Sequence, residues 1–478
     1  MPLVEVRRPR GRSAEESALG RAERFHVHAV TAILAWGVVA FGAVYPWGYQ
    51  PLAVACAIVG GIALVTRRLR TSGSIAVALA AVAIAVILQV VSLPAGALQR
   101  FSPTAVTLLS RYDLAFALQP GASHSLSIDP SQTLLGLFLV VCFGVFFLGL
   151  AAVLERRLIA RLLQSVIGIS FIVALVALVL SGNHSGRVYG FWQPQSPGAP
   201  FGPFVNRNHY AGWMLMSTLA GFGYFCALLN DAGRTRTQSW RERAIWLSTP
   251  GAARVVWVAI ALTVMALSIL ISMSRSGIAC LGIGFAVMGV VHSRKGLRGW
   301  VRAGIVAALL VFSAASVAWA GADRLAVRFS TWQDDSLGGR LAIWRDARQV
   351  IREFPAAGTG FNTFGTAMRF YQTTHLQEHY AEAHNDYLQI AAEGGLLIGI
   401  PALALVVVFV RTARRRLRET LQGSRAYWIR VGALTAMLAV MLQDAADFSL
   451  QIPGNAALFC LLAAVAVHRS SASQVRPL

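Results

Sequence analysis

The sequence predicts an all-α fold: a polytopic membrane helix bundle of about 12 transmembrane helices, with a long helical loop on the non-cytoplasmic side. Hydrophobic residues make up 56% of the 478 residues and charged residues only 13%, which is more apolar than a water-soluble chain needs for its core. Several uncharged runs are long enough to cross a bilayer core, which takes about 20 helical residues. The runs lack the alternation of period two that a membrane β-barrel requires, so we expect helices.

Twelve apolar runs follow one another along the chain, and each predicts a transmembrane helix. The second, eighth and twelfth runs are short for a bilayer. The runs cover residues 26–45, 51–66, 74–93, 131–152, 157–181, 209–230, 254–274, 276–292, 301–321, 385–410, 427–447 and 454–468.

The basic residues gather on one side of this arrangement. The formal net charge is +21, from 42 Lys and Arg residues against 21 Asp and Glu residues. If the N-terminus is cytoplasmic, the inner segments hold more than two thirds of the basic residues, as the positive-inside rule predicts. We therefore attribute the basic excess to membrane topology and, second, to attraction toward anionic membrane lipids. We expect no nucleic acid as a partner.

The domain organisation predicted from the sequence is simple. There is no clear internal repeat and no low-complexity linker, which predicts one membrane domain over residues 26–468. Tails at 1–25 and 469–478 are expected in the cytoplasm. No small-residue cleavage site follows the first apolar run, so we expect it to remain as a signal anchor. The five cysteines fall within apolar runs without close spacing, which favours core residues over disulfide partners or metal ligands.

Three longer segments lie on the predicted outer side, at residues 94–130, 182–208 and 322–384. The last is the longest, and long connections in a compact protein are often functional. Within it, GGRLAIWRDARQVIREFP predicts an amphipathic helix that ends at Pro355. Arg340, near the N-terminus of this helix, is placed to reach a lipid headgroup or a bound anion. The apolar positions at helical spacing are Leu341, Trp344, Ala347, Ile351 and Phe354.

Arg275 lies in ISMSRSG, between two apolar runs at the outer end, where basic residues are scarce. Two interpretations are open. The arginine snorkels and anchors the end of a helix. Alternatively, its guanidinium binds phosphate through bidentate hydrogen bonds, supported by neighbouring hydroxyls. These hydroxyls belong to Ser272, Ser274 and Ser276.

His384 opens EAHNDYLQIAAEGG, where the long outer segment meets the tenth apolar run. Its imidazole is a candidate general base near neutral pH, oriented by Glu382, Asp386 or another carboxylate. The alternative is an interfacial histidine without a role. Glu393 favours the functional interpretation, because a carboxylate inside an apolar run is costly unless it is paired or faces a polar cavity.

Two further outer stretches are rich in polar or small residues. AAGTGFNTF follows Pro355, and its glycines would let the backbone approach an anion. No Gly-Lys-Ser/Thr follows, so a plain turn is favoured over a phosphate-binding loop. GPFVNRNHYAG, at 202–212, places amides at the outer mouth of the sixth run, where they hold sugar hydroxyls or cap the helix. The polar residues of this stretch are Asn206, Arg207, Asn208 and His209.

The stretch QDAADFSLQIPGN puts Gln443, Asp444 and Asp447 at the outer end of the eleventh run. These carboxylates either pair with an arginine as structure or orient the catalytic base. A structural role is favoured for Asp444, and both roles stay open for Asp447. The outer segments contain no compact Asp-x-Asp pair or carboxylate–histidine cluster, so we expect no metal and no other cofactor.

Taken together, these stretches resemble the O-antigen ligase and O-antigen polymerase superfamily of bacterial membrane glycosyltransferases. The resemblance rests on SRSG at 274–277, on GGRLAIW followed by FPAAGTGFNTF within 338–364, and on a HNDYLQIAAEGGLLG-like stretch at 384–399. Ile398 interrupts the last motif before Gly399. GPFVNRNHYAG and DFSLQIPGN extend the resemblance to most of the outer face.

The resemblance implies that a glycan is transferred from an undecaprenyl diphosphate carrier to an acceptor hydroxyl at the periplasmic face of the inner membrane. Residues 322–384 would then form a periplasmic loop. The acceptor is lipid A-core, as in lipopolysaccharide biosynthesis, a growing polysaccharide or a protein. By resemblance, Arg275 and Arg340 bind the diphosphate and His384 deprotonates the acceptor. Further candidates for substrate binding are Asn206, Arg207, Asn208, His209, Asn385, Glu393 and Asp447.

The chemistry of the residues agrees with this implication. A lipid diphosphate is a weakly basic leaving group, so it departs without a general acid when arginines stabilise its growing charge. One base for the acceptor then suffices. A single displacement would invert the anomeric centre.

Two kinds of alternative remain. A polysaccharide polymerase or a protein O-oligosaccharyltransferase of the same superfamily would share the arginine and histidine pattern, so the acceptor stays open. A secondary transporter, from another class, would place polar groups and broken helices at the bilayer midplane. The unusual residues gather at the outer end instead, which favours the enzyme.

Overall fold

The computed structural model describes residues 10–66, 73–119, 121–182, 186–194, 199–234, 248–293, 336–374 and 379–469. The expected span 301–321 and the first part of the long outer segment lie outside these ranges. The described chain is helical apart from a two-stranded antiparallel ribbon of β1 (Ser92–Leu93) and β2 (His124–Ser125). The all-α prediction is confirmed.

Eight of the described helices are long and apolar enough to cross a membrane. They are α2 (Pro46–Thr66), α3 (Gly73–Val90), α7 (Pro130–Val153), α8 (Arg156–Ser181), α9 (Arg207–Arg234), α11 (Pro250–Ile271), α17 (Asp386–Glu419) and α18 (Arg425–Gln443). Two shorter apolar helices are α12 (Arg275–Ser293) and α19 (Pro453–Val467), and the first apolar run falls on α1 (Arg10–Val39). Every expected run except 301–321 therefore coincides with a helix. The chain is a multi-pass membrane protein, whereas the count of twelve stays a prediction.

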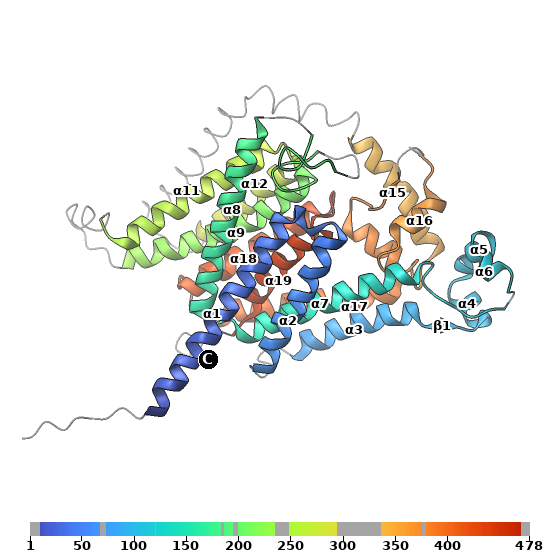
Figure 1. Cartoon of the computed structure of the whole chain (residues 1–478), viewed down its shortest axis with the longest axis horizontal. Coiled ribbons are helices and arrows are strands. Elements are labelled where there is room, and N and C mark those ends of the chain that lie inside the picture. Colours follow the sequence, from blue (N-terminus) through green and yellow to red (C-terminus); the bar gives the residue numbers. More distant parts are fainter. Residues whose placement is uncertain are drawn as a thin grey trace, which may run out of the picture.

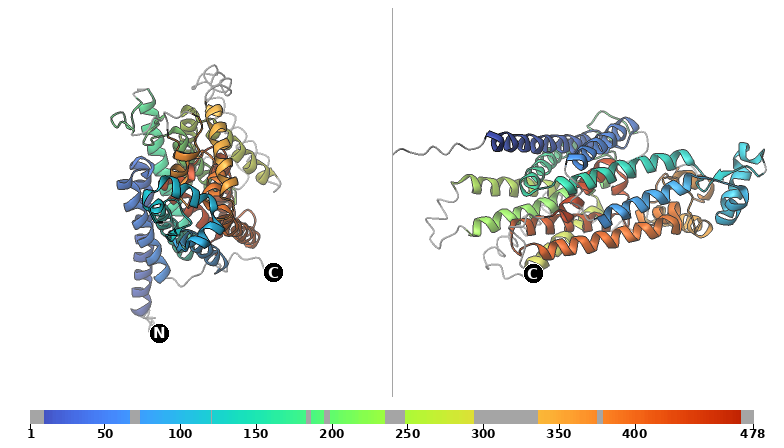
Figure 2. Two further views of the ribbon diagram at one scale, coloured as in Figure 1. Left: turned by 90° about the vertical axis from the view of Figure 1, so that its right-hand side faces the viewer. Right: turned by 90° about the horizontal axis from the view of Figure 1, so that it is seen from below.

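The helices α9 and α18 form the centre of the bundle. Their apolar windows are 83% and 78% buried, against 11% for α17 at the edge. A Cβ added at Gly223 of α9 would lie 2.6 Å from the Cα of Gly432 of α18, so only glycine permits this approach. Membrane helices associate through such small residues because lipid supplies little hydrophobic driving force between helices. At the edge, α3, α7 and α17 lie side by side (Figures 1 and 2).

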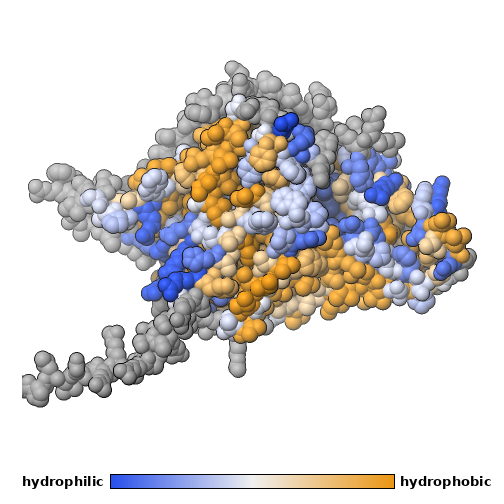
Figure 3. Space-filling view, in the orientation of Figure 1, coloured by the Kyte–Doolittle hydropathy of each residue, from blue (hydrophilic) through white to orange (hydrophobic). Residues whose placement is uncertain are grey.

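The outside of the bundle is apolar. Val77, Val179 and Leu403 are 70%, 79% and 65% exposed, and Figure 3 shows broad apolar areas along the helices. Apolar patches of this extent are rare on soluble monomers, and they are what the hydrocarbon core of a bilayer requires.

Short helices cover the end of the bundle from which α17 starts. Here α15 (Ser336–Glu353) and α16 (Phe364–Tyr371) pack against α17. The chain that connects the two strands forms a small lobe, which projects from the same end (Figure 1). It consists of α4 (Ala95–Phe101), α5 (Pro103–Tyr112) and α6 (Leu114–Ala117). Two 3-10 turns, η1 (Phe41–Ala43) and η3 (Ser449–Gln451), precede α2 and α19.

The amphipathic helix expected after residue 338 is present as α15, and its buried face agrees in part with the predicted one, since Ala347 and Phe354 are buried. Leu341 is 54% exposed, whereas Ile343 and Val350 are buried. Asp346, expected on the polar face, is also buried, because its carboxylate accepts hydrogen bonds from the backbone N–H and the hydroxyl of Thr373. The pairing of Asp346 with Thr373 thus lets a charged residue join the buried face, which hydrophobicity alone does not predict.

Candidate active site

Asp447 is the buried centre of a polar cluster just beyond the C-terminal end of α18. Its Oδ1 lies 3.8 Å from Nε2 of His209 at the start of α9, and its Oδ2 lies 4.0 Å from the guanidinium of Arg340 on α15. The side chain of Asn208 also forms a hydrogen bond with this carboxylate. Three segments that are far apart in the sequence therefore meet at one carboxylate.

His384 belongs to the same cluster through Phe448. The ring of Phe448 makes edge contacts with both imidazoles, with centroid distances of 4.5 Å to His209 and 4.8 Å to His384. Arg340 lies close enough to influence the charge of both His384 and Asp447. The structure thus brings together His384, Arg340, His209 and Asp447 from the predicted site.

The backbone on both sides of His384 is held in place. The carbonyl of Ala383 accepts a hydrogen bond from the indole N–H of Trp344 on α15 at 3.0 Å, and the N–H of Ala383 donates to Oε1 of Gln389 at 2.9 Å. Asn385 then caps α17 by accepting hydrogen bonds from the N–H groups of the first turn. His384 itself has a φ of 49°, a strained conformation that persists where the surroundings impose it.

The surroundings of His384 favour a neutral ring. Burial and the nearby Arg340 guanidinium lower the pKa of His384 to about 4. Burial raises the pKa of Asp447 to about 6, although Arg340 acts in the opposite direction. At neutral pH the imidazole is therefore unprotonated and able to accept a proton, while the carboxylate beside it is mostly ionised.

Several buried polar atoms face one another at this cluster without being satisfied. Within the described ranges, no hydrogen-bond partner is found for Nδ1 of His384, for either ring nitrogen of His209, or for Oδ2 of Asp447. Native proteins pair nearly all buried polar groups. A concentration of unpaired atoms at one point indicates a position for a polar ligand group or water.

Arg275 is placed by the sharp turn between α11 and α12. Met273 has a φ of 55°, and Ser274 caps α12 by accepting a hydrogen bond from the N–H of Gly277. The hydroxyl of Ser274 donates to Oδ1 of Asn208 at 2.8 Å. Because Asn208 in turn binds the carboxylate of Asp447, the turn that carries Arg275 is tied to the cluster through one side chain.

Two of the carboxylates considered as partners of His384 have other partners. Glu393 is buried and accepts hydrogen bonds from the N–H groups of Asn362 and Phe364 and from Gln389. Asp386 accepts one from Gln451 at 2.6 Å. Glu393 therefore holds the backbone around the site. Gln389, which donates to Glu393, also accepts a hydrogen bond from the N–H of Ala383 and so fixes the residue before His384.

The glycine-containing stretch after Pro355 is docked on α17, not open to an anion. The N–H groups of Thr359 and Gly360 donate to the carbonyls of Ala392 and Glu393. Gly358 has a φ of 66°, and a Cβ there would overlap the backbone of Glu393. The favoured interpretation, a turn, agrees with this geometry.

Gln89 at the outer end of α3 is a supporting residue that the sequence analysis missed. It donates to the carbonyls of Ala357 and Glu393 and accepts from the N–H of Phe361. The sequence contained an indication of this role, because an amide side chain in an otherwise apolar run needs a polar partner when it is buried.

The amides at 202–212 and at 385 act partly as helix caps. Asn206 accepts a hydrogen bond from the N–H of Asn208 at 2.8 Å, at the start of α9. Asn385 caps α17 and also donates to the carbonyl of Ala445 at 2.9 Å. Arg207 begins α9, and its N–H donates to the carbonyl of Ala199.

The comparison with protein families gives a match that coincides with this region. Residues 260–400 match the family model of O-antigen ligase. This part of the chain is similar to the O-antigen ligase domain. Members of the family are membrane glycosyltransferase-like ligases and polymerases. No curated protein matches the chain.

The O-antigen ligase domain contains only part of the cluster. Arg275, Arg340 and His384 fall within residues 260–400, whereas His209 and Asp447 lie outside them. The fold therefore completes the site with residues on either side of the domain. Within the described chain, no group of three or more His, Cys, Asp or Glu residues is arranged to hold a metal ion.

Proposed function

We propose that the protein transfers a glycan from undecaprenyl diphosphate to an acceptor hydroxyl, with His384 as the general base and Arg275 and Arg340 binding the diphosphate. We place the protein in the bacterial inner membrane, with the site facing the periplasm. The expected acceptor is lipid A-core. A polysaccharide or a protein acceptor would make the enzyme a polymerase or a protein O-oligosaccharyltransferase instead.

The observation that carries the proposal is the proximity of a neutral, partly buried histidine and an arginine in the segment that is similar to O-antigen ligase. Nδ1 of His384 is buried without a hydrogen-bond partner among the described residues, and the Arg340 guanidinium lies 4.0 Å from Asp447 and close enough to lower the pKa of His384. A base and a cation side by side suit a reaction that removes a proton from one oxygen and leaves negative charge on another.

The reaction balances with these groups. Nδ1 of His384 takes the proton of the acceptor hydroxyl as its oxygen attacks the anomeric carbon. The bond between that carbon and the diphosphate oxygen breaks, and its electron pair leaves with the lipid diphosphate. Arg340 and Arg275 offset the charge that develops on the leaving oxygens. The proton on His384 then passes to solvent.

In this proposal Asp447 positions Arg340. Asn208 and His209 lie next to the Asp447 carboxylate. Asp447 is the carboxylate that contacts both His209 and Arg340, so it keeps the guanidinium turned toward the histidines. Asn206 and Asn385 support the site as caps, and Glu393 supports the backbone next to His384.

Deleting the gene and separating the cell-surface glycans on a gel tests the proposal. We expect polymer to disappear from lipid A-core while lipid-linked polymer accumulates. Accumulation of single repeat units would instead show a polymerase. Unchanged glycans on every carrier and acceptor would reject glycan transfer.

A further inference from the structure

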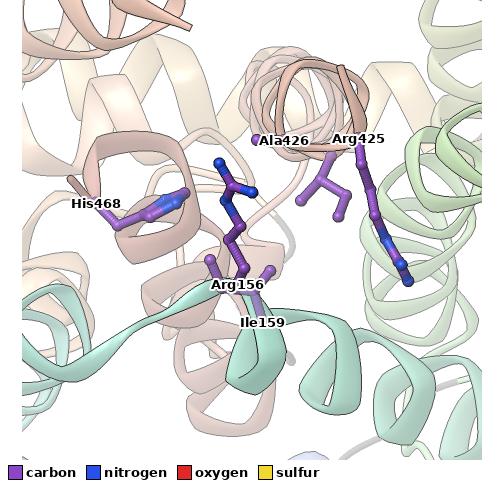
Figure 4. Close-up of a pocket in the computed structure, with 6 residues that line it drawn as sticks. Arg156, Ile159, Arg425, Ala426 and His468 are labelled. Atoms are coloured by element: carbon purple, nitrogen blue, oxygen red, sulfur yellow. The ribbon is translucent and has the colours of Figure 1, made fainter. Parts of the chain in front are cut away.

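A second polar site lies at the opposite end of the bundle from His384. The helix α18 starts beside it and ends next to Asp447, and its 19 residues separate the two sites by roughly 27 Å. The site is a cleft lined by residues from α8, α18 and the end of α19 (Figure 4). The lining residues are Arg156, Ile159, Arg425, Ala426, Ile429 and His468.

The polar lining of the cleft is basic. Arg156 and Arg425 come from the first turns of α8 and α18. His468 is 3% exposed, and its Nε2 has no hydrogen-bond partner among the described residues. Figure 4 shows His468 and Arg156 extending toward each other. A buried, unpaired ring nitrogen next to an arginine indicates a missing polar partner.

The residues behind the cleft increase its positive charge. Arg430 is 1% exposed and donates to the carbonyls of Arg416 and His468 at 2.8 Å each. These hydrogen bonds occupy oxygens that would otherwise repel an anion. Arg430 thus adds a buried cation directly behind His468.

The acids near the cleft pair with arginines other than Arg156. Glu419 pairs with Arg415 and Arg416, and Asp231 lies 3.9 Å from Arg425, whose guanidinium also donates to the hydroxyl of Tyr224. In the described part of the chain, no carboxylate lies within 4.0 Å of the guanidinium of Arg156 or Arg430.

The remaining lining is apolar and suits an amphiphile. Ile159, Ala426 and Ile429 line the cleft beside the basic groups. A free inorganic anion gains nothing from such a wall, whereas the glycerol and first acyl carbons of a phospholipid do. Basic pockets between membrane helices are suited to the headgroups of anionic lipids.

We propose that this cleft binds the phosphate of an anionic phospholipid through Arg156 and His468, with the start of its acyl chains against Ile159 and Ile429. The binding would anchor the starts of α8 and α18 and the end of α19 to one lipid. The proposal does not depend on the chemistry at His384.

The test uses the full-length protein in neutral detergent and measures lipid binding by native mass spectrometry. We expect phosphatidylglycerol to bind about fivefold more tightly than phosphatidylcholine, since one basic side chain near a headgroup adds about that much attraction. Arg156→Gln should remove this preference. Arg157→Gln is the matched control, because Arg157 is exposed on the same helix but does not line the cleft.

Several results would overturn the proposal. One is equal binding of the two lipids, and another is an equal loss in Arg157→Gln and Arg156→Gln. If inorganic phosphate displaces phosphatidylglycerol at equal concentration, the cleft binds free phosphate and the lipid assignment is wrong. The thermal unfolding temperature of each variant, measured without added lipid, shows that the fold is retained.

Discussion

His384 is partly buried, and its Nδ1 is a buried atom without a hydrogen-bond partner among the described residues, which is an unfavourable arrangement in a folded protein. Its neighbours Ala383 and Asn385 are fixed by hydrogen bonds to Trp344, Gln389 and the first turn of α17. The left-handed backbone at His384 adds to the cost. Such a residue contributes little to stability, so its arrangement is best explained by its chemistry.

Replacing His384 by Gln should lower the rate of glycan transfer by about 10² to 10⁴-fold, the usual contribution of a general base. The unfolding temperature should change little, because no hydrogen bond of Nδ1 is lost. Transfer from lipid-linked glycan to acceptor by the purified protein measures the rate. His124→Gln is the control, since His124 lies on β2 outside the cluster; similar losses in both variants would argue against a base at His384.

As the pH falls, the rate of transfer should respond to protonation of Asp447 before it responds to protonation of His384. The fraction of ionised Asp447 falls as pH drops through its pKa of about 6, and Arg340 then loses its negative partner. His384, with a pKa of about 4, stays neutral over that range. We expect kcat/KM of the wild type to decline below about pH 6.

In Asp447→Asn this decline should be absent, because the side chain is neutral at every pH. The variant should have a lower but nearly constant kcat/KM between pH 5 and 7. If kcat/KM of both proteins instead declined around pH 6.5, an ordinary exposed histidine would be titrating. That result would contradict a base that stays neutral over this range.

At the scale of elements, the site depends on how the loop after α15 docks on α17. Glu393 accepts two backbone N–H groups from this loop, and Gln89 of α3 accepts a third, from Phe361. These hydrogen bonds satisfy backbone N–H groups that water satisfies in an exposed loop. A loop packed against a membrane helix needs such acceptors from the protein. The loop in turn connects α15, with Arg340, to α16.

Glu393→Ala should destabilise the protein by about 2–6 kcal/mol, since two buried N–H groups lose their acceptor at about 1–3 kcal/mol each. Glu419→Ala, at the other end of α17, should cost at most about 1 kcal/mol, because its ion pairs are partly exposed. Chemical unfolding of both variants in detergent compares them. Equal costs would show that Glu393 does not hold the loop.

At the scale of the whole molecule, the two ends of the bundle differ in charge and chemistry. One end carries the cluster around Asp447, and the other carries the basic cleft and the arginine-rich end of α17. The positive-inside rule assigns the arginine-rich end to the cytoplasm, so the cluster is expected to face the periplasm.

Cysteine labelling in intact cells tests this orientation. In a cysteine-free background, Ala381→Cys should react with a membrane-impermeant maleimide from outside, because residue 381 is exposed next to the cluster. Gln422→Cys, exposed between α17 and α18, should react only after the cells are permeabilised. The reverse pattern would place the site in the cytosol and defeat the proposed function.

The helices themselves were largely predictable from the sequence, because each apolar run must satisfy its own backbone hydrogen bonds in lipid. The amphipathic α15 was also predictable as a helix. Its buried face was predictable only in part, since Asp346 is buried where its carboxylate accepts hydrogen bonds from Thr373. Residues such as Arg275, Arg340 and His384 stood out as polar groups at the edges of apolar runs.

What the sequence determined by itself is therefore the membrane class, the approximate spans and a set of candidate residues, because hydrophobicity and charge are local properties. Only the tertiary structure decided which candidates meet. It joined His209, Arg340, His384 and Asp447 around Phe448, and gave Asn206, Asn385 and Glu393 supporting hydrogen bonds. The physical reason is that proximity between distant segments depends on how the helices pack, which no local pattern specifies.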